Sequence, residues 1–194
     1  ANRVLSYPEL VIGSKPWERT ESTIASLPVK VGDVRNIDLN YSLDWANNNQ
    51  FNVAVEIWLT DTKDGMSESI TDEVMFWLKS PWFNPGGSPV YSGSDAIGSY
   101  TVYHAESWGS NGNTYTALVY DQDQKDGVLD IDDLLQEMVR NGLISDQVYV
   151  RSVEIGAEVV GGTGWWQTNS LDLEISNGWD VTGSDLSEVL PGGE

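Results

Sequence analysis

The chain has 194 residues, nine of them Trp and none Cys, and a formal net charge of −20 from 30 acidic and 10 basic side chains. This length suits one domain with a substantial core, and the lack of Cys excludes disulfides and a thiol nucleophile. The negative field disfavours nucleic-acid binding, because it repels phosphate backbones, but it tolerates an uncharged polymer.

Other features of the composition narrow the class of protein further. His104 is the single His, which disfavours a His-based triad or a zinc site. The sequence contains no run of about 18 apolar residues, so no membrane span is expected. The first residues lack a charged-then-apolar leader, so any signal peptide is expected to be absent or already removed.

Short stretches of alternating apolar and polar residues follow one another along the chain, separated by clusters of Gly, Pro, Asn, Asp and Ser. This pattern is typical of an antiparallel β-sandwich. The predicted strands are residues 33–44, 51–60, 71–79, 98–104, 114–120, 147–159 and 170–176. Residues 178–194 are polar and Gly-rich, which predicts a loosely attached tail after a single domain over residues 1–177.

Residues 132–143 have apolar side chains at helical spacing instead of alternation. Asp133, with Gln136 three residues further on, is predicted to cap the start of this helix, and Gly142 is predicted to end it. The fold class predicted is therefore all-β with one α-helix. The apolar residues that share one helical face are Leu134, Leu135, Met138 and Val139.

The acidic run 121–133, just before this helix, resembles a calcium-binding loop only in composition. Aligning Gly127 with the glycine of an EF-hand places Gln122 and Gln124 at ligand positions, and starting the loop at Asp121 places Lys125 at one. An acidic turn is the favoured interpretation, with calcium binding as the alternative.

The parity of three predicted strands separates their side chains into two faces. In residues 71–79, one face is apolar, and the other carries Glu73, Met75 and Trp77. The strands 51–60 and 147–159 repeat this arrangement. Because an ordinary solvent face carries Lys, Thr and Ser, the second face is expected to be concave and half-buried. Its further members are Asn52, Ala54, Glu56, Trp58, Glu154, Gly156 and Glu158.

Carboxyl groups on such a face have the chemistry that glycosidic cleavage needs. Burial and mutual repulsion push carboxyl pKa values apart, so that one acid can protonate the leaving oxygen while the other attacks or activates water. Trp and Tyr rings stack on the apolar faces of sugars. The residues alone leave an alternative open, in which these glutamates are exposed strand residues and the Trp side chains fill the core.

At these positions the sequence resembles glycoside hydrolase family 12, the compact β-jelly-roll endoglucanases. Asp72-Glu-Val-Met-Phe-Trp-Leu78 resembles the nucleophile strand of the family, and Val153-Glu-Ile-Gly-Ala-Glu-Val159 resembles its acid/base strand. Ser6-Tyr-Pro-Glu9 and Gly13-Ser-Lys-Pro-Trp17 are similar to an early segment of the thermophile branch. The resemblance covers roughly residues 3–176 and begins after the strands that usually precede the Tyr-Pro-Glu segment.

The resemblance implies a role for each matching residue. Glu73 would be the nucleophile, Glu158 the general acid/base with a raised pKa, and Glu56 a supporting acid beside Glu73. The substrate-binding residues would be Met75 and Trp77 next to the nucleophile, Pro85 and Gly86 in a loop crossing the cleft, and Trp17 as an aromatic platform.

The implied activity is that of a secreted endo-β-1,4-glucanase acting on cellulose-like glucan, mixed-linkage glucan or xyloglucan. The implied mechanism is double displacement with retention, which requires carboxyl groups about 5–5.5 Å apart and no metal or cofactor. A noncatalytic carbohydrate-binding or assembly module derived from such an enzyme is the alternative, and a β-sandwich adhesion protein is a third candidate.

Overall fold

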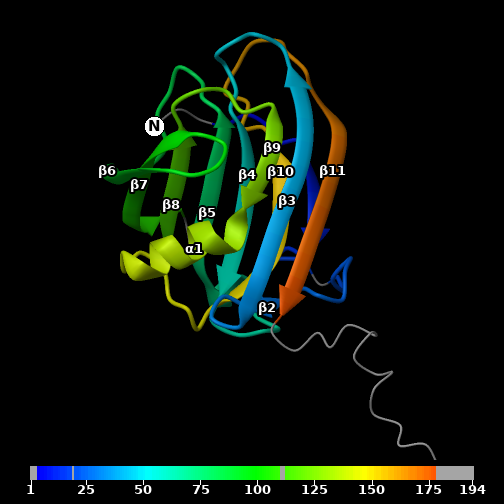
Figure 1. The fold of residues 1–194 in the computed structure, drawn as a ribbon, viewed down its shortest axis with the longest axis vertical. Helices are drawn as coiled ribbons and strands as arrows, with labels where there is room; N and C mark the ends of the chain where they lie inside the picture. Colours follow the sequence, from blue (N-terminus) through cyan, green and yellow to red (C-terminus); the bar gives the residue numbers. More distant parts are fainter. Residues whose placement is uncertain (1–3, 19, 110–111, 178–194) are drawn as a thin grey trace, which may run out of the picture.

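The computed structural model describes residues 4–18, 20–109 and 112–177, so the predicted tail lies outside the described residues. Its strands form two sheets, and Figure 1 shows the smaller one with α1 (Ile131–Arg140) in front of the larger. The larger sheet has the order β1 (Glu9–Gly13), β10 (Tyr149–Gly156), β4 (Val53–Thr60), β5 (Ile70–Lys79), β8 (Asn113–Tyr120), β7 (Ser99–Trp108) and β6 (Ser88–Ser94).

The smaller sheet is built from β11 (Trp166–Asn177), β3 (Val34–Trp45) and β9 (Asp126–Asp130), in that order. The short β2 (Val29–Lys30) pairs with β10, and a 3-10 turn (Ser67–Ser69) precedes β5. The predicted two-layer sandwich with one helix is therefore confirmed. The pairing is antiparallel throughout these strands except between β5 and β8, which run parallel.

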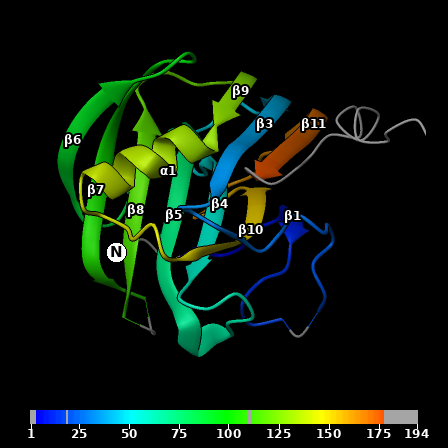
Figure 2. The same cartoon turned by 60° about the horizontal axis from the view of Figure 1, so that its bottom comes forward.

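The main core lies between the two sheets and under the helix. Alternate residues of the central strands point into it, so that β-branched and aromatic side chains form its centre. Figure 2 shows α1 on the side of the larger sheet that the smaller sheet covers. From β4, β5 and α1 the core receives Val53, Val55, Ile57, Leu59, Val74, Phe76, Leu78, Leu134, Leu135 and Met138.

The helix begins at Ile131, three residues earlier than a cap at Asp133 implies. Asp130, not Asp133, is the N-cap, and its carboxylate accepts a hydrogen bond from the Asp133 backbone N–H at 3.0 Å. The predicted cap is wrong because Ile131 already faces the core and Asp133 lies in the first turn. Gly142, at a φ of +71°, ends the helix as predicted, and the backbone N–H groups of Gly142 and Leu143 close a Schellman-type turn.

Among the described residues, α1 is the one α-helix, and its ten residues are too few and too polar to cross a membrane. Of the acidic run, residues 126–130 form β9 and pair with β3, residues 121–125 form an irregular segment before it, and the last three residues begin the helix. β1, β2, β6 and β9 were not predicted from the sequence.

Candidate active site

The parity prediction for the three central strands is confirmed. Val74, Phe76 and Leu78 point into the main core, whereas Met75 and Trp77 belong to a separate cluster on the opposite face. That second cluster also contains Ala54, Tyr115 and Ala117, with Phe83 and Trp108 packed against it. The second face of the larger sheet is therefore a partly buried aromatic surface, as the pattern of residues predicted.

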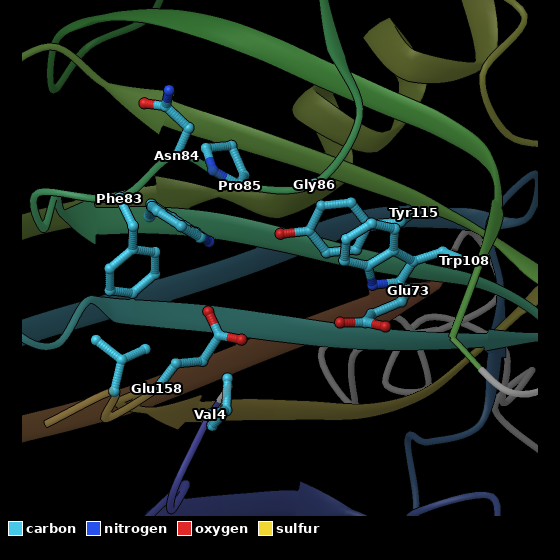
Figure 3. Close-up of a pocket in the computed structure, with 11 residues that line it drawn as sticks. Val4, Glu73, Phe83, Asn84, Pro85, Gly86, Trp108, Tyr115 and Glu158 are labelled. Carbon is cyan, nitrogen blue, oxygen red and sulfur yellow. The ribbon is translucent and has the colours of Figure 1, made fainter. Parts of the chain in front are cut away.

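A cavity of about 270 Å³ lies over this face. Figure 3 shows Glu73 and Glu158 with their carboxyl groups directed toward the same space, below the segment that carries Pro85 and Gly86. Glu73 comes from β5, and Glu158 follows the end of β10. The cavity is lined by Val4, Glu73, Trp77, Phe83, Asn84, Pro85, Gly86, Trp108, Tyr115, Glu158 and Val160.

The structure brings five predicted site residues together around this cavity: Glu73, Glu158, Trp77, Pro85 and Gly86. The remaining predicted residues lie beside it or outside it.

Glu56 and Met75 occupy opposite positions on β4 and β5, directly beside the lining residues. Met75 is covered by Tyr115, whose hydroxyl approaches its sulfur at 3.4 Å. Trp17 does not line the cavity. Its ring instead packs edge-on against Trp58, with centroids 4.9 Å apart, and Trp58 is the β4 partner of Glu73.

Phe83, Trp108 and Tyr115 line the cavity but were not predicted from the sequence as site residues. Tyr115 lies opposite Glu73 in the parallel register of β5 and β8, and Trp108 stacks on Tyr115 at 5.0 Å. The alternation of β8 offered a signal for Tyr115, because it shares the face of Ala117. Phe83 lies in a loop, and Trp108 follows a register shift in β7 between Ala105 and Trp108, so strand alternation places neither of them.

Gly86 allows the loop to pass close to Trp108. A Cβ atom at Gly86 would lie 2.3 Å from the Trp108 ring, well inside van der Waals contact. The loop therefore crosses the cavity at a position where a side chain would displace the ring.

Asn52 fixes Glu158 at two points. Its amide nitrogen donates to Glu158 Oε2 at 2.5 Å, and its amide oxygen accepts a hydrogen bond from the Glu158 backbone N–H at 2.7 Å. Asn52 is itself fully buried just before β4. The carboxyl group of Glu158 is therefore held in one orientation toward the cavity.

The carboxyl groups of this face have raised pKa values. Burial raises the pKa of Glu158, and the hydrogen bond from Asn52 opposes that shift. Burial, followed by the charges of Glu158 and Glu154, raises the pKa of Glu73 to about 8. Burial and the charge of Glu73 raise that of Glu56 to about 8 as well. A raised pKa was expected for Glu158 alone, but Glu73 and Glu56 share it. The cluster therefore retains protons at neutral pH.

One group of carboxylates has the spacing of a metal site. Oxygens of Glu9, Glu56 and Glu154 lie within 4.8 Å of one another. The Lys15 ammonium, however, is 2.5 Å from Glu9 and 3.0 Å from Glu154, so a protein cation already lies among them. The prediction that no metal takes part stays a prediction.

Two carboxyl groups on the open face of a two-layer β-sandwich, among aromatic rings, are the arrangement of a jelly-roll polysaccharide hydrolase. The model of glycosyl hydrolase family 12 matches residues 4–176. The chain belongs to this family, and the resemblance seen in the two glutamate motifs is confirmed.

Named relatives agree with this assignment. Endoglucanase S of Pectobacterium parmentieri is 27% identical over 165 residues, which are 83% of this chain and 62% of that protein. The chain thus spans less than two thirds of the length of this curated relative.

Solved structures have the same fold. The family 12 xyloglucanase of Bacillus licheniformis superimposes with a TM-score of 0.82 at 28% identity, covering 91% of this chain and 77% of that one. An endoglucanase of Rhodothermus marinus gives 0.79 at 22% identity, covering 91% and 76%, a likeness that concerns the fold alone.

Proposed function

We propose that the chain is an endo-β-1,4-glucanase that works by retaining double displacement, with Glu73 as nucleophile and Glu158 as general acid/base. The observation that carries this proposal is that both carboxyl groups lie on one face of one sheet and line one cavity. Membership of the family and the endoglucanase and xyloglucanase relatives support it.

The first half of the reaction forms a covalent glycosyl-enzyme. Glu73, as carboxylate, attacks the anomeric carbon, while Glu158, as carboxylic acid, donates its proton to the departing glycosidic oxygen. In the second half, Glu158 takes a proton from water, whose oxygen attacks the same carbon and releases Glu73. The raised pKa of Glu158 keeps its proton available for the first step.

Glu73 must be ionised although several carboxyl groups share its surroundings. Glu56 is 6% exposed and does not line the cavity, whereas Glu73 does. We infer that the proton which this pair retains resides on Glu56, because the more enclosed carboxyl loses more solvation on ionising. Glu56 then supports Glu73 as a neutral group, and the negative charge is left where the sugar carbon arrives.

Aromatic side chains in the cavity suit a β-1,4-linked glucan backbone. Trp77, Phe83 and Trp108 present apolar rings to the cavity, and Asn84 adds a polar group. The substrate classes proposed are cellulose-like glucan, mixed-linkage glucan and xyloglucan. Because such polymers do not enter cells intact, we propose that the protein acts outside the cell.

The test is release of reducing ends from barley β-glucan, carboxymethylcellulose and xyloglucan in parallel. We expect the wild-type chain to release them, and Glu73→Gln or Glu158→Gln to reduce the rate by at least about a thousandfold. Glu174→Gln, on the exposed side of β11, is the matched control and retains full activity. Unchanged activity in the two cavity variants would refute the roles, and saturable binding without any release would favour the noncatalytic module.

A further inference from the structure

A row of charged side chains connects the edge of the larger sheet with the cavity. Glu154 on β10 lies opposite Glu56 on β4, and Glu56 lies opposite Met75, two residues from Glu73. Glu9 belongs to β1, which pairs with the other side of β10. Carboxyl groups thus follow one another across four neighbouring strands, from β1 to the cavity.

Lys15 places its ammonium inside this row. Its Nζ atom is 2.5 Å from Glu9 Oε1, 3.0 Å from Glu154 Oε2 and 5.0 Å from the centre of the Trp17 ring. The Lys15 side chain is 8% exposed and that of Glu154 is 0% exposed. The Ser152 hydroxyl donates to the other Glu154 oxygen at 2.7 Å. Within the described ranges, Lys15 is the one cation in a salt bridge with these carboxylates.

One ammonium among three carboxyl groups leaves the row short of positive charge. Burial, the contact with Glu9 and the charge of Glu56 raise the pKa of Glu154 to about 8, although Lys15 and Ser152 lower it. Burial lowers the pKa of Lys15, but Glu9 and Glu154 outweigh this, so its pKa is raised and the ammonium stays charged.

Two phenols also face the row, in addition to Glu158, and they supply no charge of their own. Burial and the charge of Glu56 raise the pKa of Tyr7. Burial and the charges of Glu158 and Glu73 raise that of Tyr115. Both phenols therefore stay neutral, and the charge balance of the row depends on Lys15.

We propose that Lys15 is a positioning residue of the active site, whose ammonium neutralises the inner part of the carboxyl row and so allows Glu73 to ionise in the cavity. The proposal rests on the proposed role of Glu73 as nucleophile. Lys15 does not line the cavity. Its positive charge lowers the pKa of Glu56 and offsets the negative charge of Glu154, which raises the pKa of Glu73. The enclosed setting keeps these interactions strong.

The pH dependence of kcat/KM tests this role. Activity rises with pH as Glu73 loses its proton, so the acid limb of the profile follows the pKa of Glu73. Lys15→Met removes the compensating charge, and we expect the acid limb to move to higher pH by about one unit. Glu154→Gln removes the opposing charge, and the limb moves to lower pH. Lys15→Arg retains the charge and leaves the limb near its wild-type position.

Opposite shifts from the two halves of one ion pair separate a charge effect from a loss of structure. A purely structural role predicts lower rates in both variants with unmoved limbs, and this result would overturn the proposal. Lys125→Met is the matched control, because it breaks the exposed Lys125–Asp44 pair on the other side of the molecule. We expect no shift from it.

A readout without substrate keeps this test separate from the proposed function. The Glu73 carboxyl titration can be followed by ¹³C NMR on glutamate-labelled protein, with Glu73→Gln assigning the signal. A higher midpoint in Lys15→Met supports the proposal, and an unchanged midpoint overturns it. Absence of reducing-end release by the wild type would instead count against the proposed function. If Lys15→Met does not fold, Lys15→Gln, which also removes the charge but keeps a hydrogen-bonding side chain, is titrated in its place, and an unchanged midpoint again overturns the proposal.

Discussion

Asn52 is the residue that governs how Glu158 is presented. It donates to the carboxylate and accepts from the backbone N–H of the same residue. This double contact sets both the direction of the acid and part of its pKa, since a hydrogen bond to the charged form favours ionisation. A strand parity argument places Asn52 on the correct face but cannot indicate which neighbour it contacts.

Asn52→Ala separates these two effects. Loss of the donor is expected to raise the pKa of Glu158 and so to move the alkaline limb of kcat/KM to higher pH. Loss of orientation is expected to lower kcat by about ten- to a hundredfold. The pH profiles of wild type and variant provide the measurement. Asn40→Ala, exposed on β3 in the smaller sheet, is the control, and an alkaline limb that stays in place contradicts the role of this hydrogen bond.

Strands with one face in the core and the other over the cavity could be predicted from the sequence, and edge strands could not. β4, β5 and β10 alternate because each separates the main core from the aromatic face. β6 is largely exposed and contains Pro89, and in β9 only Leu129 is buried. The parallel pairing of β5 and β8 could not be inferred, because alternation reports faces and not neighbours.

The residues of the active site also divide into those that strand alternation could predict and those that it could not. Both glutamates came from strand motifs, whereas Phe83 and Trp108 belong to segments brought together by tertiary folding alone. The N-cap was misplaced for a similar reason. Asp130 and Asp133 are both good capping residues, and the end of β9 selects the earlier one.

The loop that carries Pro85 and Gly86 is the element whose contact can be tested directly. Gly86→Ala introduces a Cβ where Trp108 lies, so the ring must move and the cavity changes shape. We expect a clear loss in kcat/KM on β-glucan with little change in melting temperature, because Trp108 is only partly buried. A double-mutant cycle with Trp108→Ala provides the measurement. Additive effects would show that Gly86 acts independently of the ring.

The carboxyl row makes the stability of the folded chain depend on pH. Glu56, Glu73 and Glu154 have folded pKa values of about 8, above the ordinary 4.5. Between these values the folded chain binds more protons than the unfolded chain, so rising pH favours unfolding. The contribution of these groups is fully present below pH 4.5 and is lost as the pH rises to 8.

We therefore expect the melting temperature to fall as the pH is raised from 5 to 8, as measured by calorimetry. The net charge of −20 adds surface repulsion in the same direction, but salt screens surface charges far more than buried ones. A fall that persists in about 1 M NaCl and becomes smaller in Glu56→Gln would identify the buried groups as its source. A melting temperature that rises over this range would contradict the interpretation.

The parallel pairing of β5 and β8 has a consequence for how this molecule can change. Glu73 and Tyr115 stand side by side because of hydrogen bonds between their own strands, whatever path the chain takes from one strand to the other. The chain between these two strands forms β6, β7 and the loop with Pro85 and Gly86 that crosses the cavity. The segment that crosses the cavity and the strands beneath it can therefore change independently: insertions, deletions or swaps between Ser80 and Gly112 can reshape the cavity while Glu73 and Tyr115 keep their register.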